Sequence, residues 1–193
     1  MSPGDLEQVR RPLRRDARES RDKLVAAARA EFASRGVDAS LEKIARDAGV
    51  SIGTLYRHFP TRDALIMAVY RDEVDTLCGT ARTLRDSLPG DEALAAFLRE
   101  FVDFVQARHG LAHTLAALMA TRAEEFSEGS RELEQAVTDL VAAGVADGTL
   151  RDDITAGAVM VALHGVGGAR DRPDWRAEAD GVITLLVDGM RSL

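Results

Sequence analysis

The stretch SLEKIARDAGVSIGTLYRHFPTR, residues 40–62, has the pattern of two short helices joined by a tight turn. Ser40 stands where an N-cap is needed, and apolar residues follow it at helical spacing: Leu41, Ile44, Ala45 and Ala48. Gly49 can adopt the left-handed conformation that a sharp helix exit requires, and Ser51 offers its hydroxyl as the next N-cap. The stretch therefore predicts a helix–turn–helix unit.

The second of these helices should expose a polar and basic face. Ile52, Leu55 and Phe59 fall on its inward side, and Tyr56 lies at the margin. The outward side holds small, hydroxyl-bearing or basic residues: Ser51, Gly53, Thr54, Arg57 and His58. A helix enters the major groove of DNA when the side chains nearest the bases are small or hydrogen-bonding, while hydroxyls and cations reach the phosphates. This face therefore favours DNA binding, and Pro60 ends the helix.

Residues 49–62, GVSIGTLYRHFPTR, together with the helix from Leu41, resemble the DNA-binding segment of the TetR family of bacterial repressors. The resemblance runs from about Asp16 to the start of the helix after Pro60, and the rest of the chain matches in general character only. It implies an all-helical dimer in which each subunit has a three-helix DNA-binding domain and a larger regulatory domain. Arg62 departs from the family, which often has Lys there, and this exchange could alter a phosphate contact.

The resemblance also implies which residues meet the operator. The predicted DNA-binding residues are Ser40, Lys43, Ser51, Gly53, Thr54, Tyr56, Arg57, His58 and Arg62. Tyr56 and His58 are expected to contact phosphates, while the small residues before them lie close enough to base edges to influence sequence preference. The expected partner is double-stranded operator DNA, palindromic because two subunits would bind it.

Composition and charge agree with a helical protein that has one basic end. The 193 residues are 46% hydrophobic, with few aromatic residues and prolines and no alternating β-branched runs, so we expect an all-α chain of about nine helices. The net charge is −7, yet residues 1–72 hold 14 Lys and Arg against 11 Asp and Glu, and residues 73–193 hold 11 against 21. The basic end is the helix–turn–helix end. The charged N-terminus and the single cysteine favour the cytoplasm.

Breaks in the helical pattern predict three segments. Residues 1–15 read as a flexible Arg-rich arm, residues 16–62 as the DNA-binding domain and residues 63–193 as a helical regulatory and dimerisation domain. The arm is either a solvated tail or a segment that follows phosphates or enters the minor groove. Asp16 and Glu19 fit a capping box at the start of the first helix, which Gly36 ends. A long helix over 61–87 links the two domains.

Five further helices are expected beyond residue 90. The first, capped by Asp91 and ending before Gly110, has a wide apolar face. The second, at about 111–123, is apolar on nearly every side and should be central in its domain. The others cover about 130–147, 154–169 and 175–190. The uncharged run at 154–169 is shorter than the roughly 18 residues of a membrane span, so no membrane helix is expected.

No catalytic constellation is apparent in the sequence. A glycine-rich phosphate loop after a strand and a cysteine–histidine cluster with zinc-site spacing are both missing. His109 and His113 could share a helix face, but no third metal ligand is near. Cys78 lacks neighbours that would lower its pKa, so we expect a packing or surface residue and not a redox sensor. We therefore expect no enzyme activity, no cofactor and no metal.

Two further surfaces are predicted in the regulatory domain. The last two helices carry glycines and more aliphatic residues than one contact would use, which predicts a two-fold dimer interface. Its residues would be Gly157, Ala158, Val161, Gly165, Val182, Ile183, Leu186 and Met190. Aromatic residues at helical spacing suggest a pocket for a small apolar ligand. Its lining would be Phe97, Phe101, Phe104, His113, Leu115, Met119 and His164. Plain core packing is the alternative reading of both sets.

The expected function is a DNA-binding transcriptional regulator, most simply a repressor that a small apolar ligand releases from its operator. In the mechanism that the resemblance implies, the ligand shifts the long helix and changes the distance between the two recognition helices. The alternative is a helical small-molecule-binding protein or enzyme that binds no operator. A salt-sensitive, dimer-sized complex with the DNA flanking its own gene would separate these two classes.

Overall fold

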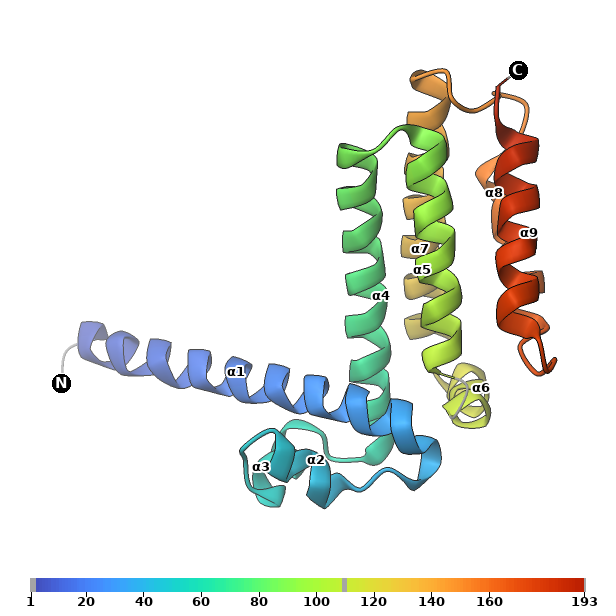
Figure 1. Cartoon of the computed structure of the whole chain (residues 1–193). Coiled ribbons are helices and arrows are strands. Elements are labelled where there is room, and N and C mark those ends of the chain that lie inside the picture. The colour runs from blue at the N-terminus through green and yellow to red at the C-terminus, as the bar shows by residue number, and fades with distance from the viewer. Residues whose placement is uncertain (1–2, 109–110, 193) are drawn as a thin grey trace. The chain divides into compact units, whose positions relative to one another are not determined.

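The computed structural model describes the backbone of residues 3–108 and 111–192. Its helices are α1 (Pro3–Arg35), the short 3-10 helix η1 (Gly36–Asp38), α2 (Leu41–Asp47), α3 (Ile52–His58), α4 (Arg62–Ser87), α5 (Gly90–Ala107), α6 (Ala112–Thr121), α7 (Ala123–Ala146), α8 (Ala156–Gly168) and α9 (Trp175–Met190). In the described ranges no β-strand forms, and one isolated bridge joins Leu150 to Arg191. The all-α prediction is confirmed (Figure 1).

The chain divides into two compact units, Met1–Asp72 and Glu73–Leu193. The boundary falls inside α4, later than the expected division between residues 62 and 63. The reason is that the first turns of α4 bury Leu65, Ile66 and Val69 and belong to the first unit. We call the two parts the DNA-binding unit and the regulatory unit.

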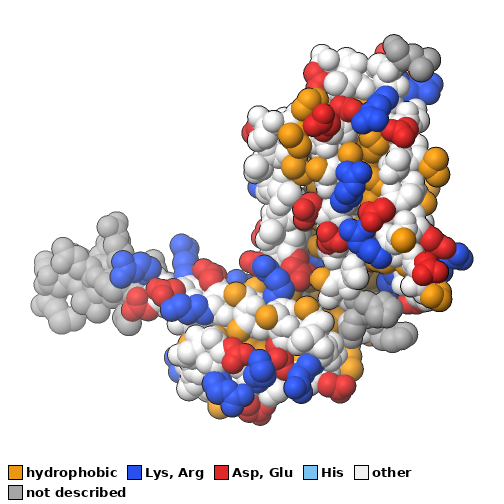
Figure 2. Space-filling model, in the orientation of Figure 1, with side chains coloured by type: hydrophobic (Ala, Val, Ile, Leu, Met, Phe, Trp, Pro, Cys, Tyr) orange, Lys and Arg blue, Asp and Glu red, His pale blue; other side chains and the backbone are white. Residues whose placement is uncertain are grey.

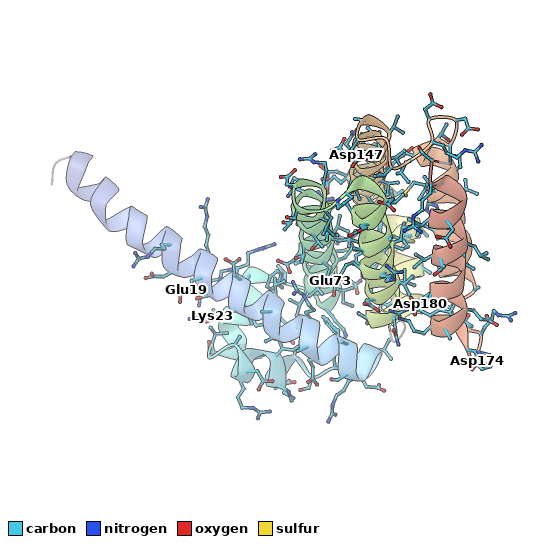
Figure 3. All side chains as sticks on the ribbon, turned by 45° about the horizontal axis from the view of Figure 1, so that its top comes forward. Glu19, Lys23, Glu73, Asp147, Asp174 and Asp180 are labelled. Atoms are coloured by element: carbon cyan, nitrogen blue, oxygen red, sulfur yellow. The ribbon has the colours of Figure 1, made fainter. Side chains whose placement is uncertain are left out.

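α1 begins at Pro3 and not at Asp16, so residues 3–15 form helix where a flexible arm was expected. Proline suits the first position of a helix, because its φ is preset and the N–H that it lacks would have no partner there. Eight of residues 4–15, GDLEQVRRPLRR, are Leu, Glu, Gln or Arg, which are good helix formers, although Gly4 and Pro12 are not. The predicted capping box is wrong, because Asp16 lies inside the helix. Glu19 instead pairs with Lys23 one turn later, at 2.7 Å (Figure 3).

The DNA-binding unit has one apolar core to which all of its helices contribute. The buried residues are Leu24, Val25, Ala28 and Phe32 of α1, Ile44 and Ala45 of α2, Leu55 of α3, Phe59, and Leu65, Ile66 and Val69 of α4. Each large apolar side chain buried in this way stabilises the fold by roughly 1.5–3 kcal/mol. Ile52 was expected on the inward side of α3 but is 37% exposed.

α5 is the central helix of the regulatory unit. It packs against α7, α8 and α9 (Figure 1). Its most deeply buried large residues are Leu94, Phe97, Leu98 and Val102. The wide apolar face predicted from the sequence therefore lies in the middle of this unit.

α6 does not have the central place that its apolar sequence predicted. It packs on α7 and leaves Met119 50% exposed, and Ala116, Ala117 and Ala120 are exposed as well. Alanine side chains bury little area, so an Ala-rich helix gains less from a central position than α5 with its Phe and Leu residues.

The N-terminus of α5 approaches the end of α7 at very close range. A Cβ added at Gly90 would lie 2.1 Å from the Cα of Gly144, so this contact requires glycine at residue 90. Gly90 donates its N–H to Oδ2 of Asp147 at 2.7 Å, and Asp91 donates its N–H to Oγ1 of Thr149 at 3.1 Å. The end of α7 thus caps α5 from outside.

Asp91 was predicted to cap α5, but Pro89 occupies the N-cap position and Asp91 lies in the first turn. Asp147, at the end of α7, supplies the acceptor instead (Figure 3). The Thr149 hydroxyl donates to Oδ1 of Asp147 at 2.6 Å and, with the N–H groups of Thr149 and Gly90, holds the pKa of that carboxyl below its usual value.

α8 and α9 are tied together by the indole of Trp175, which donates its N–H to the carbonyl oxygen of Val166 at 2.6 Å. Trp175 is itself buried. Throughout residues 3–108 and 111–192, every helix is too short or too polar to cross a bilayer.

Candidate DNA-binding surface

Both predicted N-caps of the helix–turn–helix are present. Oγ of Ser40 accepts the N–H of Lys43 at 3.2 Å, and Oγ of Ser51 accepts the N–H of Thr54 at 3.1 Å. Each bond satisfies an N–H that the helix itself leaves without a partner, and losing such a cap costs about 1 kcal/mol.

The turn between α2 and α3 is a Schellman motif. Gly49 has φ +71, and its N–H donates to the carbonyl of Arg46 at 3.0 Å. Val50 donates to the carbonyl of Ala45, also at 3.0 Å. These two bonds need a left-handed residue at position 49, where glycine carries no steric penalty. The predicted exit from the first helix is therefore confirmed.

The outward face of α3 is small and polar. Ser51, Gly53 and Arg57 are exposed, and Tyr56 is 47% exposed. A Cβ added at Gly53 would have only Oγ of Ser51 near it, at 3.8 Å. The backbone of α3 can therefore be approached closely at this point.

Thr54 and His58 are half-buried beside these exposed groups. The hydroxyls of Ser51 and Thr54 lie 2.9 Å apart and share a hydrogen bond. The ring of His58 is tilted on that of Phe59, with centroids 6.3 Å apart. Both side chains keep a polar group at the rim of the α3 face.

Three cations of the predicted DNA-binding set differ in how many partners they already have within the protein. Arg57 has no hydrogen-bond or ion-pair partner among the described residues. Arg62 donates from Nη2 to the carbonyl oxygen of Val37 at 2.6 Å, and its guanidinium lies 5.5 Å from the ring centroid of Phe32. The side chain of Arg62 therefore ties the start of α4 to η1 and to Phe32 of α1, a role that the sequence did not indicate.

Lys43 already pairs with two carboxylates of the DNA-binding unit. Its Nζ lies 3.0 Å from Oε2 of Glu31 and 2.6 Å from Oδ2 of Asp47. The ammonium donates to the Glu31 carboxylate and holds the pKa of that group below its usual value, and the N–H of Ser40 acts in the same direction. Glu31 was missed in the sequence, because a glutamate at this position of a helix normally faces water.

The apolar surface of α8 and α9 contains part of the predicted dimer set. Val161 is 74% exposed and Val182 is 38% exposed. Gly157, Ala158 and Gly165 are exposed beside Val161. Figure 2 shows hydrophobic side chains at the surface along the edge where α9 lies.

Ile183 and Met190 do not belong to this surface. They are 0% and 2% exposed and pack inside the regulatory unit, so they offer almost no surface to a second copy. Leu186 is half-buried. Leu185, which the prediction omitted, is 74% exposed. It follows Ile183 by two residues, and the rotation of about 200° over two residues would have placed it on the opposite side of the helix.

The residues predicted to line a ligand pocket lie in different environments. Phe97 is fully buried, and Leu115 is buried as well. Phe101 and Phe104 are half-buried, with ring centroids 5.7 Å apart, and the guanidinium of Arg108 covers the Phe104 ring. This pair is the part of the predicted lining that the fold brings together.

Met119 and His164 lie at the surface of the regulatory unit. Met119 is 50% exposed, and the exposed His164 donates from Nδ1 to the carbonyl oxygen of Met160 at 2.7 Å. His109 and the side chain of His113 lie outside the described residues. Among the residues that the structure describes, no cluster of His, Cys, Asp and Glu could hold a metal ion.

A hollow of about 360 Å³ lies between α4 and α7, where the sequence predicted nothing. It is lined by Asp75, Cys78, Ala81, Arg82, Arg85, Glu132, Gln135, Ala136, Asp139 and Leu140. Burial raises the pKa of the Cys78 thiol, in agreement with the expectation of an unreactive residue. Residues so far apart in the chain gave no local signal for this hollow.

Family models match both units. Residues 24–69 match the family described as "Bacterial regulatory proteins, tetR family". Residues 89–192 match the family described as "Transcriptional regulator SbtR-like, C-terminal domain". The first match lies within the DNA-binding unit and the second within the regulatory unit.

Solved structures agree with these matches. A TetR transcriptional regulator from Streptomyces coelicolor is 44% identical, with a TM-score of 0.76, over 89% of this chain and 98% of that chain. A TetR transcription regulatory protein from Mycobacterium vanbaalenii is 31% identical, with a TM-score of 0.75, over 94% and 100%. A relative found by sequence, the HTH-type transcriptional repressor KstR2 of Mycolicibacterium smegmatis, is 28% identical over 146 residues, 69% of each chain.

Proposed function

Because the chain belongs to the TetR family of bacterial transcriptional regulators, we propose that it is a homodimeric repressor that binds palindromic operator DNA through α3. A small apolar ligand would release it. The observation that carries the proposal is the outward face of α3, which exposes hydrogen-bonding groups and Arg57, a cation with no partner in the part of the chain that the structure describes.

In this proposal α3 lies in the major groove. The exposed Gly53 lets the backbone come near the base edges, and the hydroxyls of Ser51 and Thr54 are within reach of them. Tyr56, Arg57 and His58 contact phosphates on either side, which fixes the register of the helix on the duplex. Ser40 acts at the start of α2 as a cap, and Arg62 ties the start of α4 to Val37.

The dimer forms through the exposed face of α8 and α9. Val161 and Leu185 would otherwise leave most of their apolar surface in water, and each gains roughly 1.5–3 kcal/mol when it is covered. The exposed glycines of α8 allow a second copy to approach closely. A two-fold dimer places two α3 helices about 34 Å apart, one turn of the duplex.

Control by a ligand would pass through α4, the one helix that runs through both units. In the regulatory unit, Arg108 at the end of α5 donates from Nε at 2.7 Å to Oε2 of Glu73 on α4, and its guanidinium covers Phe104. Glu73 is labelled in Figure 3. A ligand that displaces the Phe101–Phe104 pair would therefore disturb a contact of α4. A ligand that prefers the released state a hundredfold changes the equilibrium by about 2.7 kcal/mol per site.

The experiment is a titration of a fluorescent duplex, taken from the region flanking the gene, with the wild-type protein at several salt concentrations. The proposal expects a saturable complex with two chains per duplex and an affinity that falls linearly on a log–log plot against salt. An unlabelled duplex of unrelated sequence serves as competitor and should displace the probe poorly. A helical small-molecule-binding protein or enzyme would give no such complex.

A further inference from the structure

Glu31 is the one charged side chain that is buried within the described part of the chain, with 3% of its surface exposed. It lies on α1 among the apolar residues of the DNA-binding unit. A buried carboxylate is costly unless it is both paired and hydrogen-bonded. Its partners therefore indicate what it does.

The first partner is the N-terminus of α2. In a capping box, an acidic residue at the third helical position accepts the N–H of the N-cap residue. Here that third position is Lys43, which has no acceptor. Oε1 of Glu31 takes the bond instead, at 3.3 Å from the N of Ser40. A residue of α1 thus completes the cap of α2.

The second partner is the ammonium of Lys43, which lies 3.0 Å from Oε2 of Glu31. Asp47 holds the same ammonium from the other side, and Arg35 reaches Oε1 of Glu31 at 3.6 Å from α1. The side chain of Lys43 is 41% exposed, but its ammonium is already in contact with two carboxylates, one of them buried.

We infer that Glu31 is a positioning residue for DNA binding, which with Lys43 forms a brace that fixes α2 on α1. α2 packs on α3, and the Schellman turn at Gly49 joins them, so the position of α2 on α1 determines the orientation of α3. Lys43 then contributes to affinity through Glu31 and neutralises no phosphate. This inference rests on the proposed function and revises the role first expected of Lys43.

A double-mutant cycle tests the brace. The variants are Glu31→Gln, Lys43→Met and the two combined, with affinity measured on the flanking duplex where circular dichroism shows each variant folded. Lys43→Met should weaken binding about tenfold in the wild-type background and less than about twofold in the Glu31→Gln background. Equal losses in both backgrounds would show that Lys43 acts without Glu31 and would overturn the inference.

Salt dependence separates a brace from a phosphate contact. Lys43→Met should leave the slope of log affinity against log salt unchanged, because no counterion release is lost. A slope smaller by about 0.9 would place Lys43 on a phosphate and contradict the inference. Unchanged affinity in every variant would show that the brace does not position α3.

Asp47→Asn is the variant of choice if the substitutions at Glu31 and Lys43 do not fold, because Asp47 is exposed. The brace predicts unchanged affinity and slope, since Glu31 still holds Lys43. A phosphate-binding Lys43, released from Asp47, would bind more tightly and with a steeper slope. Should the wild type itself not bind the duplex, the proposed function fails, and this outcome is distinct from every result above.

Discussion

The outward face of α3 and the outward face of α8 and α9 are both exposed, but water affects them in opposite ways. Ser51, Gly53 and Arg57 lose nothing by facing water, whereas Val161 and Leu185, each 74% exposed, forgo the gain of burial. An exposed apolar surface therefore indicates a partner, because leaving it in water costs free energy. A polar surface indicates a partner only when its groups lack hydrogen-bond and ion-pair partners within the described residues. Arg57 meets this criterion, whereas Lys43 and Arg62 do not.

The largest effect should come from breaking the apolar face. Leu185→Arg places a charge where the second copy would pack, so we expect a folded monomer and a loss of operator affinity of about 10²-fold or more, since both half-sites no longer bind together. Sedimentation velocity gives the mass, and the duplex titration gives the affinity. Thr184→Arg, at an exposed neighbour on another side of α9, should remain dimeric. A folded Leu185→Arg dimer would remove α9 from the interface.

Breaking the polar face should cost less. Arg57→Ala should weaken binding about tenfold and reduce the salt slope by about 0.9, as expected for one lost phosphate contact. Arg62→Ala is the matched control, because this arginine is bonded to Val37 and stacked on Phe32. It should lower the melting temperature and keep the slope. Identical slopes for Arg57→Ala and wild type would place Arg57 away from the phosphates.

A smaller change should follow at the centre of α3. Thr54→Val keeps the shape of the side chain but removes the hydroxyl that lies 2.9 Å from Ser51, while the Ser51 cap remains. Affinity should change only a few-fold, and unequally among duplexes that differ by single base pairs in each half-site. A uniform change across all duplexes would indicate that Thr54 does not read base edges.

The smallest effect concerns the contribution of the Glu31–Lys43 ion pair to stability. The Lys43 ammonium lowers the pKa of Glu31, so this pair stabilises the fold above the ordinary glutamate pKa, about 4.3, and the stabilisation is lost as pH falls through the lower folded value. The difference in melting temperature between wild type and Glu31→Gln should be constant from about pH 7 to pH 5 and narrow below about pH 4. A difference in melting temperature that stays the same at every pH would argue against the ion pair.

The helix–turn–helix could be predicted from the sequence because its determinants are local. Ser40, Gly49 and Ser51 act on residues within one turn of themselves, and each was found in its expected place. α9 occupies the predicted residues 175–190 for a similar reason, since Pro173 and the end of its aliphatic run limit it.

The remaining features depend on packing between distant residues. α9 is aliphatic on several sides, so periodicity alone did not tell that Ile183 faces inward and Leu185 outward. The cap of α5 comes from Asp147, which belongs to the end of another helix. The role of Glu31 required knowing that Lys43, from another helix, brings its ammonium to 3.0 Å from the buried Glu31 carboxylate. Such pairings arise only after the helices have packed.

Footprinting of the flanking duplex tests most directly whether the apolar face of α8 and α9 serves to hold two α3 helices on one DNA. We expect two protected half-sites related by a palindrome, with centres about 34 Å apart on one face of the duplex, and their joint loss with Leu185→Arg. A single protected half-site for the wild type, or two sites that persist undiminished in a monomeric Leu185→Arg protein, would contradict it.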